Sequence, residues 1–330
     1  MEGFWKDDIE LANDLATVRE RMQEVVDNSH GFIRKLLQTQ VNSGGKMLRP
    51  ALVLLSSRLG TNPRKEQVLK IASILEMIHI ASLIHDDILD MALTRRGVAT
   101  LYAKVGAKQA VLAGDYLLSK AISMIGSNED NGVKASAVAN AFSRLCESEL
   151  DQDAAQNDFF ISKSTYIRRI AGKTAALFAL CCYSGAATAD ASEHQQYLMH
   201  RFGYAFGMSF QVQDDILDYV GNEQDLGKQT GRDLQCGIPT LPLIFALEEE
   251  RRRGPKRPLA ALLTDRGSHL NNKDTAKAVS YVIQLGGIER ATAVSDMYRN
   301  RALRDLQSVD NAEVAAKLKA LFVKLINRPS

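Results

Sequence analysis

Apolar positions recur along this chain with helical spacing, in long stretches separated by short polar interruptions. Between Arg64 and Ile238 there is no proline, the residue that most disrupts a helix interior. Strand signals, such as alternating β-branched runs beside Asn-Gly or Asp-Gly turns, are absent from the sequence. The pattern therefore predicts an all-α protein.

The polar interruptions divide the pattern into individual helices. The most apolar stretch, Ala175 to Ala189, is too short to span a bilayer and is interpreted as a buried core helix. The basic run RRRGPKRP at 251–258 is interpreted as a solvated linker rather than an anion site. A polar loop is predicted at 221–240, and shorter helices separated by 251–258 and 286–287 follow it. Before this loop, one helix begins near Pro50, and the others cover about 7–41, 63 to the turn at 94–97, 107–126, 133–157, 164–187 and 192–220.

Composition narrows the class of protein. The 330 residues are 45% hydrophobic and 24% charged, as in an ordinary globular protein. A net charge of +2 gives no reason to expect a nucleic-acid partner. We expect residues 1–330 to form a single domain. We also expect a cytoplasmic protein, because the start MEGFWKDDIE lacks the apolar core of a signal peptide. The four cysteines have no metal-ligand spacing and are expected to be reduced and mostly buried: Cys146, Cys181, Cys182 and Cys236.

One pentapeptide, DDILD, occurs twice, each time after an apolar helical run. Asp86 and Asp90 in the first copy, and Asp214 and Asp218 in the second, lie four residues apart and so share a helix face. Carboxylates at this spacing repel one another unless a cation lies between them, and Mg²⁺ prefers such oxygen ligands together with phosphate. If the two copies face one another, they form a cavity that can hold Mg²⁺ and a diphosphate.

Glycine and lysine precede the apolar run of each copy, in GGKMLRP at Lys46 and in AGKTAAL at Lys173. Glycine lets a phosphate approach the backbone, and lysine supplies a positive charge. Together with EMIHIASLIHDDILD, GDYLLSKA and FQVQDDILDY, these segments occur in the order found in trans-isoprenyl (polyprenyl) diphosphate synthases, over about two thirds of the chain. The sequence resembles this family, in its long-chain type. The resemblance implies one large helical bundle around a central cavity and a magnesium-dependent prenyltransferase.

The resemblance also assigns roles to individual residues. The diphosphate of isopentenyl diphosphate is expected at Gly45, Lys46, Arg49, His79 and Arg96. The allylic diphosphate and its magnesium are expected at Asp86, Asp90, Arg95, Lys173, Thr174, Gln211, Asp214 and Lys228, with Asp87, Asp215 and Asp218 as water-mediated ligands.

Product length is expected to depend on the helix surface beneath Asp86. In the family, bulky aromatic residues one turn before the first motif stop elongation, whereas this chain has Ala81 and Ser82 there, with Ile78 one turn further. One turn advances about 5.4 Å, near the length of a prenyl unit. We therefore expect a long product, from hexaprenyl to decaprenyl, although a geranylgeranyl product stays open.

Three alternatives stay open at this point. A class I terpene cyclase shares the fold, but it usually has one DDxxD motif and lacks GGKxxRP. A non-catalytic regulatory subunit typically loses the aspartates that are intact here. A catalytic subunit can require a dissimilar partner, so both a homodimer and a heterodimer are considered. The expected small molecules are isopentenyl diphosphate with farnesyl or geranyl diphosphate, and the lipophilic product suggests transient membrane contact.

Overall fold

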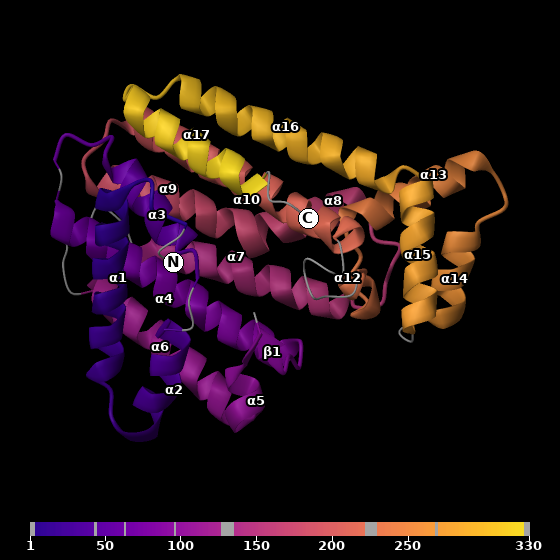
Figure 1. The fold of residues 1–330 in the computed structure, drawn as a ribbon, viewed down its shortest axis with the longest axis horizontal. Helices are drawn as coiled ribbons and strands as arrows, with labels where there is room; N and C mark the ends of the chain where they lie inside the picture. The colour runs from indigo at the N-terminus through magenta and orange to yellow at the C-terminus, as the bar shows by residue number, and fades with distance from the viewer. Residues whose placement is uncertain are drawn as a thin grey trace. The chain divides into compact units, whose positions relative to one another are not determined.

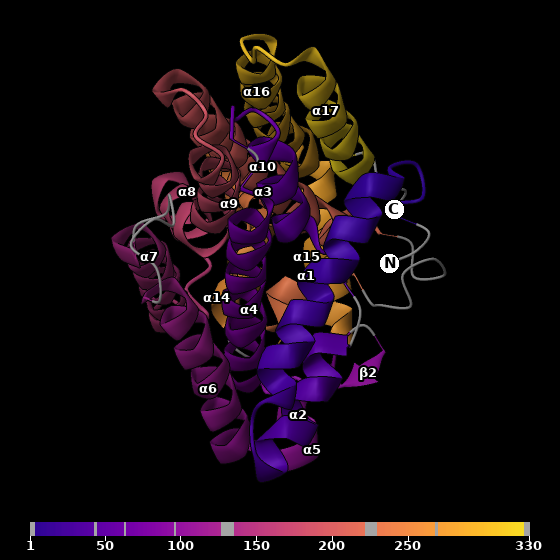
Figure 2. The ribbon, with the colours of Figure 1, turned by 90° about the vertical axis from the view of Figure 1, so that its left-hand side faces the viewer.

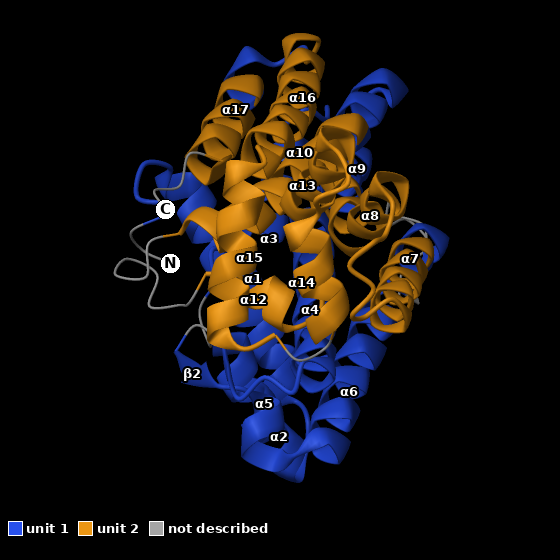
Figure 3. Cartoon of the chain, turned by 90° about the vertical axis from the view of Figure 1, so that its right-hand side faces the viewer, with its two compact units in different colours: residues 1–139, 180–200, 310–314 blue, residues 140–179, 201–309, 315–330 orange. Residues whose placement is uncertain are grey.

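The computed structural model describes residues 4–42, 45–62, 64–95, 97–126, 135–221, 230–267 and 270–326. Nearly all of the regular structure in these ranges is helical, which confirms the all-α prediction (Figure 1). The chain divides into two compact units, which are coloured in Figure 3. Unit 1 comprises residues 1–139, 180–200 and 310–314, and unit 2 comprises residues 140–179, 201–309 and 315–330. All of the boundaries except the one between Val309 and Asp310 fall within helices, and the single-domain expectation stays a prediction.

The centre of unit 1 is α4 (Lys65–Leu89), which contacts α1, α3, α5 and α6. Figure 2 shows α4 between α1 and α6. A helix surrounded in this way must be apolar on nearly every face, which explains the run ILEMIHIASLIH. The other elements of this unit are α1 (Ile9–Asp27), α2 (Gly31–Asn42), α3 (Leu48–Ser57), β1 (Thr94–Arg95), β2 (Val98–Ala99), α5 (Leu101–Val105) and α6 (Ala107–Gly126).

Unit 2 is built around α10 (Glu193–Val220), whose residues from 201 onward belong to it. One core cluster joins Met208, Val212 and Ile216 of α10 to residues of three other helices, α8, α13 and α16. Four helices, α7, α9, α10 and α17, contribute residues to both units. The remaining elements are α7 (Ala135–Ala154), α8 (Lys163–Ile170), the π-helical turn η1 (Ala171–Ala175), α9 (Ala176–Thr188), α12 (Arg232–Gln235), α13 (Leu241–Arg253), α14 (Pro258–Arg266), α15 (Asn272–Gln284), α16 (Gly287–Gln307) and α17 (Ala312–Ile326).

Two helix predictions and one loop prediction were wrong in detail. The predicted helix over 7–41 breaks after Asp27, and Gly31 begins α2 with φ +59°, a conformation that favours glycine. The helix predicted to reach 94 ends at Leu89, and a short antiparallel strand pair follows, with Arg95 opposite Val98. The predicted polar loop at 221–240 contains the four-residue helix α12.

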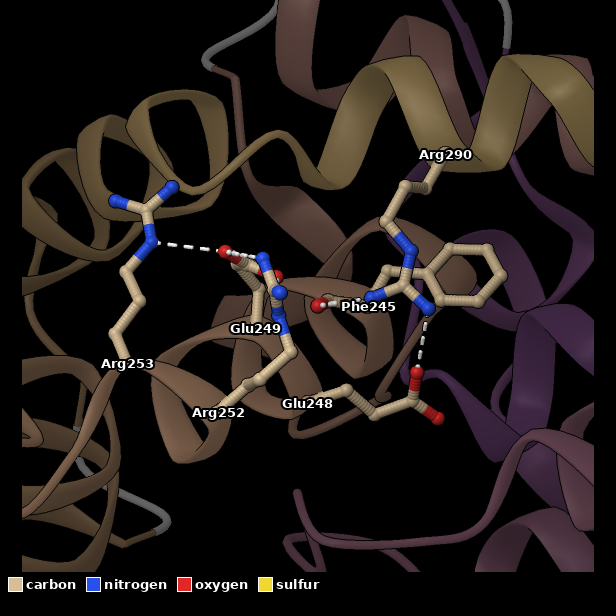
Figure 4. Close-up of polar contacts among 6 residues, drawn as sticks. All are labelled: Phe245, Glu248, Glu249, Arg252, Arg253 and Arg290. Atoms are coloured by element: carbon tan, nitrogen blue, oxygen red, sulfur yellow. Dashed lines mark hydrogen bonds and ion pairs between the residues drawn. The ribbon is translucent and has the colours of Figure 1, made fainter.

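The basic run at 251–258 is only partly a linker. Arg251 to Arg253 belong to the last turn of α13, and Figure 4 shows Arg252 and Arg253 paired with Glu249. Beside this pair, the guanidinium of Arg290 stacks on the Phe245 ring, 4.2 Å from its centroid (Figure 4). The buried Glu250 carboxylate accepts the first backbone N–H groups of α14, from Leu259 at 2.7 Å and from Ala260 at 3.0 Å. A capped helix start therefore follows the linker.

Burial also tests two minor expectations. Among the described residues, two helical stretches, Lys65–Leu89 and Lys163–Thr188, are long and apolar enough to cross a membrane, but 72% of the apolar 18-residue window in each is buried inside the protein. Such burial is typical of core helices, in agreement with the interpretation of the apolar stretch at 175–189. All four cysteines are free thiols, as expected, but only Cys181 and Cys182 are buried, whereas Cys146 is half-buried and Cys236 is exposed.

Candidate active site

The first DDILD motif forms the carboxyl end of α4 in unit 1. The N–H of Asp90 donates to the C=O of Asp86 at 2.8 Å, so these residues lie one helical turn apart on the same face, as predicted. Asp86 is half-buried and Asp90 is exposed. Both carboxylates are therefore accessible at the end of a rigid helix.

Asp87, between them, is buried with 4% of its surface exposed. Arg95 reaches back from the strand pair and donates from Nε to Asp87 Oδ1 at 2.7 Å. A buried carboxylate needs such a partner, because an isolated charge is costly to remove from water. The hairpin thus fixes Arg95 beside the first motif. Arg96 lies outside the described residues.

The second motif lies near the end of α10 in unit 2 and likewise has its second aspartate buried. Asp214 is exposed, Asp215 is buried and Asp218 is half-buried. Asp218 accepts the N–H groups of Arg232 and Asp233, each at 3.1 Å, at the start of α12. Asp218 thereby stabilises the first turn of α12. Lys228, predicted within that loop, lies outside the described residues.

A chain of hydrogen bonds connects Asp215 to the residues that were predicted to bind the allylic diphosphate. Tyr166 donates from its hydroxyl to Asp215 Oδ2 at 2.6 Å, and Gln211 donates from Nε2 to Asp215 Oδ1 at 2.8 Å. Thr174 in turn donates from Oγ1 to Gln211 Oε1 at 2.7 Å. The structure therefore brings together three predicted residues, Thr174, Gln211 and Asp215, and adds Tyr166, which the sequence analysis missed.

The electrostatics of this chain follow from its burial. Burial raises the pKa of Asp215 to about 7, although the hydrogen bonds from Tyr166 and Gln211 act in the opposite direction. Burial and the neighbouring Asp215 raise the pKa of Tyr166 well above its usual value, so Tyr166 stays the proton donor of the pair. The Asp215 carboxyl group therefore holds the side chains of Tyr166 and Gln211 in place. The neighbouring Asp214 is exposed and is accessible to a ligand.

Lys173 and Thr174 lie in the π-helical turn η1, where the N–H of Ala176 donates to the C=O of Ala171. Such wide turns are rare and often occur at functional sites. Lys173 Nζ lies 2.8 Å from Glu149 Oε1, on the neighbouring helix α7. The two helices approach closely here, since a Cβ at Gly172 would lie 1.9 Å from Ser148 Oγ. Glycine is required at this point of contact.

The residues predicted for isopentenyl diphosphate lie in unit 1. Gly45 and Lys46 precede α3, Arg49 lies in its first turn, and His79 is on α4, which contacts α3. Trp5 donates from Nε1 to the C=O of Lys46 at 2.8 Å. The predicted chain-length residues Ala81, Ser82 and Ile78 are all buried in α4, with 0%, 5% and 2% of their surfaces exposed.

The donor chemistry of both motifs fits a divalent metal bound together with a diphosphate. The accessible side chains of Asp86, Asp90 and Asp214 offer hard carboxylate oxygens. In the described part of the chain, no three His, Cys, Asp or Glu side chains are grouped so that they could hold a metal ion. Magnesium commonly keeps water and substrate phosphate among its ligands, so one or two carboxylates per ion suffice. The assignment of individual ligands stays a prediction.

Comparison with known proteins identifies the family. A family model described as polyprenyl synthetase matches residues 30–282. The heptaprenyl diphosphate synthase component 2 of Geobacillus stearothermophilus is 36% identical over 318 residues, which cover 96% of this chain and 97% of that protein.

Solved structures agree with this match. A geranylgeranyl pyrophosphate synthase from Lactobacillus brevis superposes with a TM-score of 0.90 at 29% identity, covering 99% of this chain and 100% of that one. A polyprenyl synthase from Caulobacter crescentus, complexed with calcium and isoprenyl diphosphate, has a TM-score of 0.87 at 28% identity and covers 97% of this chain and 96% of that one. The matches span nearly the whole chain, and the predicted all-α isoprenoid-synthase fold and long-chain family are confirmed. The chain belongs to the polyprenyl synthetase family and is a prenyltransferase.

Proposed function

We propose that this prenyltransferase adds isopentenyl diphosphate repeatedly to an allylic diphosphate and makes a long all-trans-polyprenyl diphosphate. The observation that carries the proposal is the shared arrangement of the two motifs. In each copy the first aspartate, Asp86 or Asp214, is accessible, and the second, Asp87 or Asp215, is buried and hydrogen-bonded. Each unit thus presents an accessible carboxylate beside a buried, hydrogen-bonded one, an arrangement that suits binding of a metal together with a diphosphate.

The family uses a divalent metal, and we propose Mg²⁺ for this chain, held by Asp86, Asp90 and Asp214. When bound, Mg²⁺ would neutralise charge on the diphosphate leaving group. Lys173 and Arg95 would add positive charge and orient the same group, so that the allylic C–O bond ionises. The alkene of isopentenyl diphosphate, held by Lys46 and Arg49, would then attack the allylic cation, and transfer of a proton from the resulting cation to the released pyrophosphate would complete the new double bond.

We propose a product in the hexaprenyl to decaprenyl range. Ala81 and Ser82, one turn before Asp86, are small and place no aromatic ring beneath the motif. Relatives named as heptaprenyl, nonaprenyl and decaprenyl diphosphate synthases, each at least 30% identical to this chain, support this range.

The subunit composition and location are also proposals. The names of two relatives, from Geobacillus stearothermophilus and Bacillus subtilis, contain "component 2", which supports a dissimilar partner as an alternative to a homodimer. We propose that the chain works in the cytoplasm, with transient membrane contact when the lipophilic product leaves.

The test is to incubate the purified chain with Mg²⁺, radiolabelled isopentenyl diphosphate and farnesyl diphosphate, and to size the products. We expect long-chain products from the wild type and none from Asp86→Asn, because the first motif then loses an accessible carboxylate. Asp265→Asn, an exposed change on α14, is the matched control and should keep full activity. Activity retained by Asp86→Asn would contradict the metal assignment, and products no longer than geranylgeranyl would contradict the proposed length.

A further inference from the structure

The amino-terminal residues Phe4 and Trp5 contact the loop that carries Lys46. The indole N–H of Trp5 donates to the C=O of Lys46 at 2.8 Å, and Trp5 has only 7% of its surface exposed. The ammonium nitrogen of Lys46 lies 5.2 Å from the centroid of the Phe4 ring. The same short segment therefore holds both the main chain and the side chain of Lys46.

The aromatic pair is itself fixed. The rings of Phe4 and Trp5 pack edge to face, with centroids 4.8 Å apart. The C=O of Trp5 accepts the N–H of Asp8 at 3.0 Å, and Asp8 caps α1 by accepting the N–H of Leu11 at 3.1 Å. Phe4 and Trp5 are thus connected to the start of a helix and do not form a loose end of the chain.

The Lys46 loop needs such support. Lys46 is exposed and precedes α3, and Met47 after it has φ +50°, in the left-handed region that non-glycine residues rarely occupy. Lysine also carries four rotatable bonds, whose freedom is lost when its ammonium is held in one place. External contacts that order this loop therefore favour any ligand that Lys46 binds.

We propose that Phe4 and Trp5 are positioning residues of the isopentenyl-diphosphate site, and that they act through Lys46. This inference rests on the proposed function, in which Lys46 binds the diphosphate. An aromatic face attracts an ammonium group through its quadrupole without cancelling the positive charge. A carboxylate in place of Phe4 would hold Lys46 as well but would repel the diphosphate. The aromatic contact orders the lysine and keeps it attractive to an anion.

Steady-state kinetics of Trp5→Phe and Phe4→Leu test the proposal. Trp5→Phe keeps an aromatic ring and removes the N–H donor, and a hydrogen bond of this kind corresponds to a change of about fivefold in binding. We expect the KM for isopentenyl diphosphate to rise about fivefold in each variant, with the KM for farnesyl diphosphate changed less than about twofold. Phe32→Leu, an exposed aromatic change on α2, is the control and should change neither KM.

A general loss of structure would change both KM values or kcat, so an equal effect on the two substrates would overturn the inference, as would an unchanged KM for isopentenyl diphosphate. A second measurement is independent of turnover. Trp5 is the one tryptophan of the chain, so its fluorescence reports on this contact. Titration with inorganic pyrophosphate should change the emission, and Lys46→Ala should weaken that response. An inactive wild type with this response would refute the proposed function alone, whereas a missing response would refute the role of Trp5.

Discussion

Replacing Tyr166 with phenylalanine removes one oxygen atom from a buried contact and leaves the ring in its core cluster. That oxygen donates to Asp215 at 2.6 Å, and Asp215 is 4% exposed. In the variant, Asp215 Oδ2 would lose this donor, and only Gln211 would still donate to the carboxylate in the hydrogen-bond chain described above. The variant therefore isolates the contribution of a single hydrogen bond to a buried carboxylate.

Its magnitude follows from the charge of the acceptor, so the comparison is made at about pH 9, where the Asp215 carboxyl, whose pKa burial raises to about 7, is ionised. A hydrogen bond to a charged group contributes about 1.5–3 kcal/mol to stability, and a neutral one about 1 kcal/mol. We expect Tyr166→Phe to lower the free energy of unfolding by about 2–3 kcal/mol. Tyr219→Phe is the matched control, because this buried hydroxyl pairs at 3.0 Å with the neutral hydroxyl of Thr240. We expect the control to lose about 1 kcal/mol.

Urea denaturation followed by circular dichroism measures both variants against the wild type under one set of conditions. We expect a clearly lower urea midpoint for Tyr166→Phe than for Tyr219→Phe. If the two variants unfold at the same midpoint, Asp215 does not depend on the Tyr166 hydroxyl, and the proposed ordering of Gln211 through Asp215 fails with it.

Two further predictions concern the α4 surface one turn before the first motif and the start of α14. Ala81→Phe should shorten the product by at least one prenyl unit, because an aromatic ring would then lie one turn before Asp86; an unchanged product on thin-layer chromatography would refute the chain-length argument. Glu250→Ala should destabilise the protein by about 2 kcal/mol in thermal denaturation, because it leaves the buried N–H of Leu259 without its acceptor. Glu248→Ala, which removes a surface pair with Arg290, should change stability by less than about 1 kcal/mol, and equal losses would contradict the role of Glu250.

The parts of the structure that follow local rules were predictable from the sequence. The all-α class follows from apolar spacing and the absence of proline, and the face shared by Asp86 and Asp90 follows from helix geometry alone. The break near Gly31 was also predictable, because Asn28 and Ser29 precede it as turn residues. A strand pair two residues long is too short to produce a pattern.

Contacts between distant segments were not predictable from spacing. Tyr166 lies on a different helix from Asp215, and Trp5 meets Lys46 across the whole of α1 and α2. Burial of Asp87 and Asp215 depends on such partners, and the sequence shows only that aspartates occur there. Hence the accessible and the buried members of each motif could not be distinguished before the fold was known.

The burial of the second aspartate in both motifs has an evolutionary consequence. Under the proposed function the first aspartate binds a ligand, whereas the second supports the fold, so the two adjacent aspartates would be under different selection pressures. A descendant subunit that abandons catalysis but keeps the fold should therefore replace the counterparts of Asp86 and Asp214 early and retain those of Asp87 and Asp215. The order in which these aspartates are replaced in a lineage would then show whether catalytic activity or the stability of the fold was lost first.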